Sequence, residues 1–107
     1  GRSIGRSIRC WDRKARVGIA ASGGFSHFVI DEALDKRLLD AFAKNDVDTL
    51  LSTPENLFQS GTSEIKNWIA ALGALEETPL RFRLGDYVPC YRSPAGTGNA
   101  MAFALWE

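Results

Sequence analysis

The chain has 107 residues, of which 45% are hydrophobic and 24% are charged, a composition typical of one small globular domain and unlike a disordered chain. Its 13 basic and 13 acidic residues cancel, which argues against a nucleic-acid partner and against electrostatic attachment to a membrane. The apolar runs are far shorter than a membrane span, and the first residues do not resemble a secretory leader. The two cysteines form no CxxC pair, so we expect a cytoplasmic protein with free thiols.

Residues 1–15 are predicted to form a partial helix and a charged link at a truncation edge. The tetrapeptide GRSI occurs twice in tandem, and Ile4, Ile8 and Trp11 recur at the spacing of one helical face. Serine and glycine are weak helix formers, so this helix would be marginal on its own.

A buried strand is predicted in the apolar run that starts at Val17 and stops at Gly23 and Gly24. The two glycines would allow a sharp turn, and His27, the only histidine in the chain, follows them. Open α/β sheets bind their ligands at the carboxyl ends of strands, so His27 is a candidate site residue. The alternative is a partly buried histidine in an ordinary strand-to-helix turn.

The next segment is predicted to be helical, with an acidic first turn and an apolar stripe that ends at Asn45 and Asp46. A short helical turn over residues 47–51 and another that begins at Pro54 would follow. We expect the carboxylates of this region to form a solvated face and to take no part in acid–base chemistry; they are Asp31, Glu32, Asp35 and Asp40.

A second helix is predicted within residues 59–75, capped by Thr62 or Ser63, with a core stripe of Ile65, Trp68, Ile69 and Leu72 and with Gly73 as a stop or a close-packing position. Glu64 lies in its first turn, and apolar residues follow at i+4 and i+7. Its side chain would therefore point inward, or it would complement the helix dipole.

The remaining segments alternate as strands do, over residues 80–84, 87–91 and 101–106, and Pro89 suggests an edge strand or a bulge. Between the last two lies a loop of small residues, 92–99, which would bring amides and hydroxyls close to an anion. It lacks the Lys-Ser/Thr ending of a P-loop, and a flexible hairpin loop is the alternative.

Three segments together resemble the carboxyl-terminal part of the class III extradiol ring-cleavage dioxygenases, in particular the catalytic subunit of the protocatechuate 4,5-dioxygenase type. The segments are SGGFSH at 22–27, GTSEIKNWIAALGAL at 61–75 and YRSPAGTG at 91–98. The resemblance implies an α/β fold in which helices pack on a layered sheet. It also implies that residues 16–107 are the carboxyl-terminal portion of the catalytic domain.

The resemblance implies a role for each matching residue. His27 would be the second-sphere acid/base, and Glu64 would be the carboxylate ligand of a non-haem Fe(II). The loop would contact the substrate, a catechol-type aromatic acid whose ring is opened with O₂, through Ser93, Ala95, Gly96, Thr97 and Asn99. In this family two histidines and one carboxylate hold the iron and leave positions open for the catechol oxygens and O₂.

The chain departs from the family because its only histidine is already assigned as the acid/base. Both histidine ligands are therefore absent, so we expect no iron bound by this chain alone and no activity in isolation. A partner chain supplying an amino-terminal half, or a homo-oligomer, would cover the sheet edges left exposed. The alternative is a non-catalytic structural or binding module that retains the dioxygenase fold.

Overall fold

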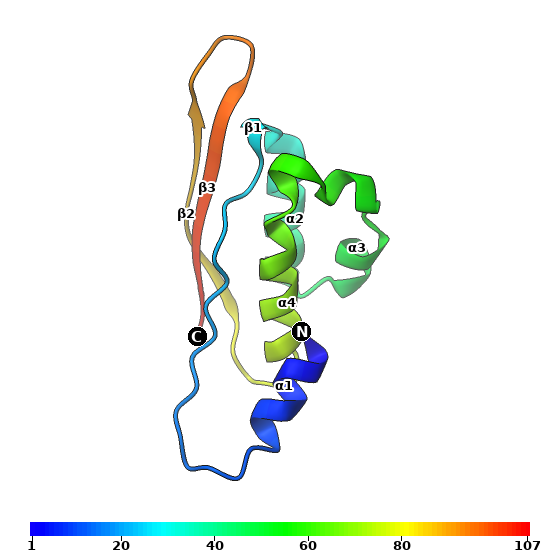
Figure 1. Ribbon diagram of the computed structural model, residues 1–107, viewed down its shortest axis with the longest axis vertical. Coiled ribbons are helices and arrows are strands. Elements are labelled where there is room, and N and C mark those ends of the chain that lie inside the picture. Colours follow the sequence, from blue (N-terminus) through cyan, green and yellow to red (C-terminus); the bar gives the residue numbers. More distant parts are fainter.

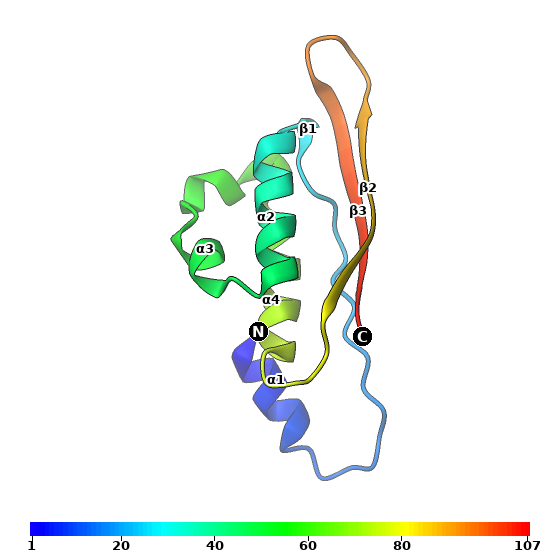
Figure 2. The same ribbon diagram turned by 180° about the vertical axis from the view of Figure 1, so that it is seen from behind.

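A computed structural model describes the whole chain, residues 1–107, as helices packed on one antiparallel sheet (Figure 1). The helices are α1 (Arg2–Arg9), α2 (Glu32–Lys44), α3 (Val47–Ser52) and α4 (Ile65–Leu75), with two 3-10 turns, η1 (Glu55–Phe58) and η2 (Ser60–Thr62). The strands are β1 (His27–Val29), β2 (Phe82–Tyr91) and β3 (Thr97–Trp106). Seen from both sides, the helices lie on one face of the sheet (Figure 2). The predicted α/β class, a sheet with packed helices, is confirmed.

The sheet is a long hairpin with a short third strand, in the order β1-β3-β2. The β2–β3 ladder runs from Phe82 opposite Trp106 to Tyr91 opposite Gly98, with one bulge at Gly85. Pro89 lies in the edge strand β2, where a residue without an N–H is tolerated, as its position in the sequence indicated. On its other side, β3 pairs with only the three residues of β1.

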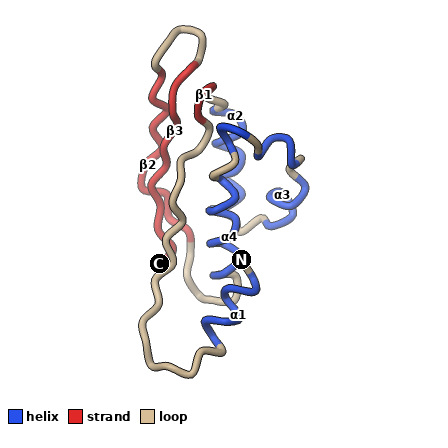
Figure 3. Tube along the Cα trace, viewed as in Figure 1, coloured by secondary structure: helices blue, strands red, loops and turns tan.

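The strand predicted before His27 is not formed, and His27 begins β1 instead. Residues 16–21 make no hydrogen bonds, and Val17 and Ile19 are 44% and 38% exposed. The segment runs beside the sheet as a loop (Figure 3). A strand requires a neighbouring ladder to satisfy its backbone, and here the first bond to β3 is Phe25 N–H to Ala100 O, at 3.0 Å.

The helical segment after His27 is confirmed, because its local signals all agree. Asp31 accepts a hydrogen bond from Leu34 N–H at 3.0 Å and caps α2, and Asn45 ends the helix in the left-handed conformation with φ 53°. Asp46 caps α3 in the same way, through Thr49 N–H. The short helix after Pro54 is the 3-10 turn η1.

Helix α4 forms in the predicted segment but begins at Ile65, so Glu64 lies at its N-cap position and not in its first turn. Neither expected cap is used, because the Thr62 hydroxyl donates to Leu57 O and Gln59 O and the Ser63 hydroxyl donates to Ser60 O. Gly73 does not stop the helix, which continues to Leu75. It is a close-packing position.

Helix α1 forms as predicted, but the expected apolar face does not drive its packing. Ile4 and Trp11 are each 52% exposed. Instead Gly5 is buried against α4, where a side chain in its place would overlap the carbonyl oxygen of Ala74. Salt bridges of Arg2 with Glu76 and of Arg9 with Glu77 flank this contact. The two helices therefore pack through small residues.

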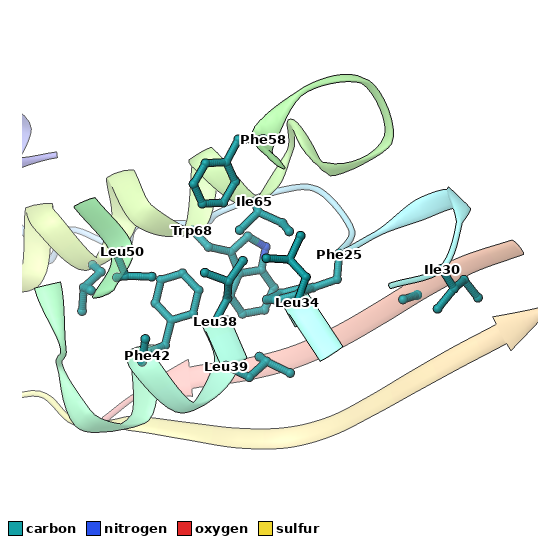
Figure 4. Close-up of a cluster of buried hydrophobic side chains, with 13 residues drawn as sticks. Phe25, Ile30, Leu34, Leu38, Leu39, Phe42, Leu50, Phe58, Ile65 and Trp68 are labelled. Carbon is teal, nitrogen blue, oxygen red and sulfur yellow. The ribbon is translucent and has the colours of Figure 1, made fainter. Parts of the chain in front are cut away.

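The core lies between the sheet and the helices α2 and α4 (Figure 4). Phe25, Leu38 and Ile65 are fully buried there. The ring of Phe25 contacts Trp68 edge-on, with 5.1 Å between centroids, which anchors the chain two residues before His27. No helix is both long and apolar enough to cross a membrane.

Candidate functional site

His27 is half-buried at the start of β1, and its ring is oriented by the backbone behind it. Its Nδ1 lies 2.9 Å from the carbonyl oxygen of Phe25. A carbonyl only accepts, so Nδ1 carries the hydrogen and Nε2 of the neutral ring holds the lone pair. Because Phe25 is fully buried, the accepting carbonyl is held in place. The imidazole therefore presents Nε2 as the atom able to take a proton.

Glu64 lies beside the double-glycine turn and is exposed. Its Oε2 accepts a hydrogen bond from Gly24 N–H at 2.9 Å. The close approach depends on Gly23, which has φ +133° and where a Cβ would come within 2.6 Å of the Glu64 Cβ. The carboxylate thus binds the turn before β1 and stays exposed, so the expected inward orientation is wrong. Glu64 lies at the N-cap position of α4, where a negative charge complements the helix dipole.

Asn99 completes a group of three predicted residues around Gly24. It is the register partner of His27 in the β1–β3 ladder. A side chain at Gly24 would come within 3.4 Å of Asn99 Oδ1 and 3.9 Å of His27 Nδ1, while Gly24 N–H itself binds Glu64. Segments far apart in the chain therefore bring an imidazole, a carboxylate and an amide to one glycine.

Of the other predicted loop residues, Ser93, Ala95 and Gly96 form an ordered turn at the tip of the β2–β3 hairpin, and Thr97 already begins β3, so the loop is shorter than the expected 92–99. The hydroxyls of Ser93 and Thr97 hydrogen-bond to each other at 2.7 Å, so each already has a partner. Gly96, with φ +82°, accepts from Ile30 N–H at 2.9 Å and ties the turn to the end of β1. Ala95 is exposed at the tip. The turn is thus held beside β1, two residues further along the ladder than the His27–Asn99 pair.

Asp35 was expected on a solvated face, and that expectation is wrong, because the residue is fully buried. Its Oδ1 accepts from Ser26 N–H at 3.0 Å, and its Oδ2 accepts from the hydroxyls of Ser26 at 2.6 Å and Tyr87 at 2.8 Å. The signal in the sequence was its spacing, since Leu38 and Leu39 follow it at i+3 and i+4 on the apolar face of the helix.

The other carboxylates of that region lie where the sequence indicated or close to it. Asp40 is exposed and paired with Lys44, and Asp31 is the exposed helix cap. Glu32 is partly buried; it accepts from Lys36 and from the Tyr91 hydroxyl, and these hydrogen bonds hold the pKa of Glu32 below its usual value.

Burial raises the pKa values of both Asp35 and Tyr87. Loss of water raises the pKa of Asp35 even though three hydrogen bonds from Ser26 and Tyr87 favour its charged form. Burial and the adjacent Asp35 carboxylate also raise the pKa of Tyr87, which stays a hydrogen-bond donor.

Gly61 also shapes this region, although its position in the sequence did not indicate a structural role. It is buried in η2, and any side chain there would overlap the backbone carbonyl of His27. The turn before α4 therefore packs directly on the strand that carries the histidine.

The donors present do not fit a ferrous ion held by this chain alone. No three His, Cys, Asp or Glu side chains gather at a spacing that would hold a metal. Glu64, the expected ligand, is hydrogen-bonded to Gly24, and the one imidazole uses Nδ1 on Phe25. The cysteines Cys10 and Cys90 are exposed and free.

The main surface hollows lie away from His27. One of about 450 Å³ separates the unpaired segment 17–21 from the end of β3 and from Trp68. Another, of about 530 Å³, lies at the ends of α2 and α4 beside Trp106.

No known family model, curated protein or solved structure matches the chain. The architecture defines it as a small α/β domain with a three-stranded antiparallel sheet.

Proposed function

We propose that the chain is the carboxyl-terminal portion of a class III extradiol dioxygenase, which opens the ring of a catechol-type aromatic acid with O₂. The observation that carries the proposal is the grouping of His27, Glu64 and Asn99 around Gly24. Each comes from a different one of the three segments that resemble this family or from the residue next to it.

In this proposal His27 is the acid/base. Its Nε2 accepts a proton from a substrate hydroxyl and returns it when the ring opens, while the Nδ1 hydrogen bond to Phe25 keeps the ring in one orientation. Asn99, the neighbour of His27 across the ladder, offers an amide to a polar group of the substrate. The hairpin turn of Ser93, Ala95 and Gly96, with Thr97 at the start of β3, forms the substrate side of the site.

Fe(II) would bind the catechol oxygens and O₂ together in the complete protein. Glu64 is the one ligand that we assign to this chain. We infer that an amino-terminal half, carried by a partner chain or reached through oligomerisation, supplies two histidines. The isolated chain would then be inactive.

The roles of His27 and Glu64 are tested in the complete protein with ring-cleavage assays and iron analysis. His27→Ala should retain iron and lose ring cleavage by about 100- to 10,000-fold, the usual contribution of a general acid/base. Glu64→Ala should lose iron and activity together. Asp40→Ala, which removes an exposed carboxylate, is the matched control. Normal ring cleavage by the His27 and Glu64 variants would refute the proposal.

A ferrous titration of the isolated chain tests the claim that the iron site is shared. We expect no tight stoichiometric binding, because one carboxylate and one imidazole engaged through Nδ1 are too few ligands. The titration is measured by calorimetry under anaerobic conditions. Tight binding of one iron per chain would contradict the claim that the site is shared.

A second candidate is a non-catalytic structural or binding module that keeps the dioxygenase fold. The observation that favours it is the single histidine, which leaves the ligand set incomplete. The two candidates separate when the chain is combined with the amino-terminal half: a module would gain neither iron nor ring cleavage.

A further inference from the structure

Ser26 and Asp35 form a buried pair directly behind His27. Both side chains are fully buried, and two hydrogen bonds join them, one from the Ser26 backbone and one from its hydroxyl. The Ser26 Oγ also accepts from Asp31 N–H at 2.8 Å, so it has both a donor and an acceptor role. Every polar atom of the pair is satisfied without a cation, and this arrangement uses the carboxylate purely as an acceptor.

The pair acts on the three residues that orient the imidazole. Ser26 lies between Phe25, whose carbonyl receives the Nδ1 hydrogen, and His27 itself. On the other side, β3 holds the same segment through Ala100, which accepts from Phe25 N–H at 3.0 Å and donates to Ser26 O at 2.8 Å. The turn is thus clamped between a strand and a helix.

The backbone just after His27 shows why a clamp is needed. Phe28 has φ +69°, a conformation that is unfavourable for a residue with a side chain, and the residue is 66% exposed, so burial does not hold it there. Such a conformation persists only when its surroundings impose it. The hydrogen bonds on residues 25–27 hold the chain on one side of Phe28, and the β1–β3 ladder with the bond from Ile30 N–H to Gly96 O holds it on the other.

We propose that Asp35 is a positioning residue for His27: by binding the Ser26 N–H and hydroxyl, it holds residues 25–27 so that the Phe25 carbonyl selects the Nδ1–H tautomer and leaves Nε2 free. The tautomer preference belongs to the chain itself, and its catalytic consequence rests on the proposed function. The competing explanation is that Asp35 serves stability alone, by tying α2 to β2 through the Tyr87 hydroxyl. These explanations can be separated because Asp35 binds two different partners, Ser26 before β1 and Tyr87 on β2, and each can be changed without the other.

The sole histidine makes the test direct, because its ¹⁵N-labelled imidazole gives one signal set whose shifts distinguish a protonated from an unprotonated nitrogen. In the wild type, at a pH where the ring is neutral, we expect Nδ1 to be protonated. Ser26→Ala and Asp35→Asn should both shift the ring toward a mixture of tautomers. Tyr87→Phe removes only the hydrogen bond from the Tyr87 hydroxyl to Asp35, and Asp40→Asn removes a surface charge on the same helix. Both variants should give the same imidazole spectrum as the wild type.

Thermal unfolding establishes that each variant is folded at the temperature of the spectrum. If Asp35→Asn does not fold, Ser26→Ala carries the test, because it removes only a hydroxyl. A folded Ser26→Ala or Asp35→Asn variant with the wild-type imidazole spectrum would overturn the proposal, as would an equal change in Tyr87→Phe. Ring-cleavage assays of the complete protein test the proposed function separately. Unchanged turnover in His27→Ala would refute the proposed function and would leave the tautomer result unaffected.

Discussion

At the scale of single residues, the chemistry behind His27 depends on one carboxylate that is buried without an ion pair. Asp35 is fully buried, and its partners are the neutral donors Ser26 and Tyr87. A buried anion without a cation is costly, and hydrogen bonds from neutral groups offset only part of that cost. Burial therefore raises the pKa of Asp35.

The stability of the chain should carry a pH dependence that comes from Asp35. Because its pKa is higher in the folded than in the unfolded chain, the folded chain binds this proton more readily. The stabilisation is fully present below the unfolded pKa and is lost as the pH rises through the folded pKa. We expect the free energy of unfolding of the wild type minus that of Asp35→Asn, measured by urea unfolding at several pH values, to fall across this range. A difference that is flat or rises with pH would contradict the assignment.

At the scale of elements, α1 is held by the absence of a side chain. Gly5 rests on the carbonyl of Ala74 in α4, and the apolar side chain of Ile4 stays 52% exposed. A helix of 8 residues is marginal in water, so its contact with α4 decides whether it forms.

Gly5→Ala should destabilise the docking of α1. Alanine favours a helix over glycine by about 0.5–1 kcal/mol, but its methyl group would overlap a backbone oxygen, and overpacking costs about 1–3 kcal/mol. Ser7→Ala, at an exposed position of the same helix, keeps the helix gain without the overlap and serves as the control. Hydrogen exchange of residues 2–9 should accelerate in the first variant and not in the second. Unchanged or slower exchange in Gly5→Ala would show that the contact does not hold the helix.

At the scale of the whole molecule, most of one edge of β3 has no paired strand, because β1 pairs only with residues 97–99. Residues 16–21 make no hydrogen bonds, and they lie along the open side of β3. Phe103 and Leu105 of β3 are 58% and 57% exposed. An unpaired apolar segment beside an exposed sheet face is the usual place for another chain to add a strand. These features support the proposed partner chain or homo-oligomer.

We therefore expect the isolated chain to self-associate as its concentration rises, as measured by size-exclusion chromatography with light scattering. Ile19→Lys should weaken this association, because a charge on an edge opposes strand pairing. Leu51→Lys is the matched control, since Leu51 is 70% exposed on α3, away from the sheet. A well-folded monomer at every concentration would argue against an oligomer or a missing partner.

The sequence by itself determined the elements whose causes are local. The cap at Asp31, the apolar stripe that follows and the stop at Asn45 lie within one helix, so α2 was predictable from its own residues. The edge position indicated by Pro89 was predictable for the same reason, but the two strands predicted over residues 80–84 and 87–91 form the single strand β2, which a bulge at Gly85 carries past the expected break. The roles of His27, Glu64 and Asn99 came from the resemblance, and the spacing of these residues in the chain does not show that they meet.

Only the tertiary structure decided the rest, because those features depend on partners distant in the chain. The apolar run after Val17 reads as a strand, yet without a neighbour to pair its backbone it stays a loop. Asp35 reads as a surface carboxylate, yet Tyr87 on β2 and Ser26 before β1 enclose it. Pairing and burial are properties of the assembled layers, and the orientation of His27 follows from both.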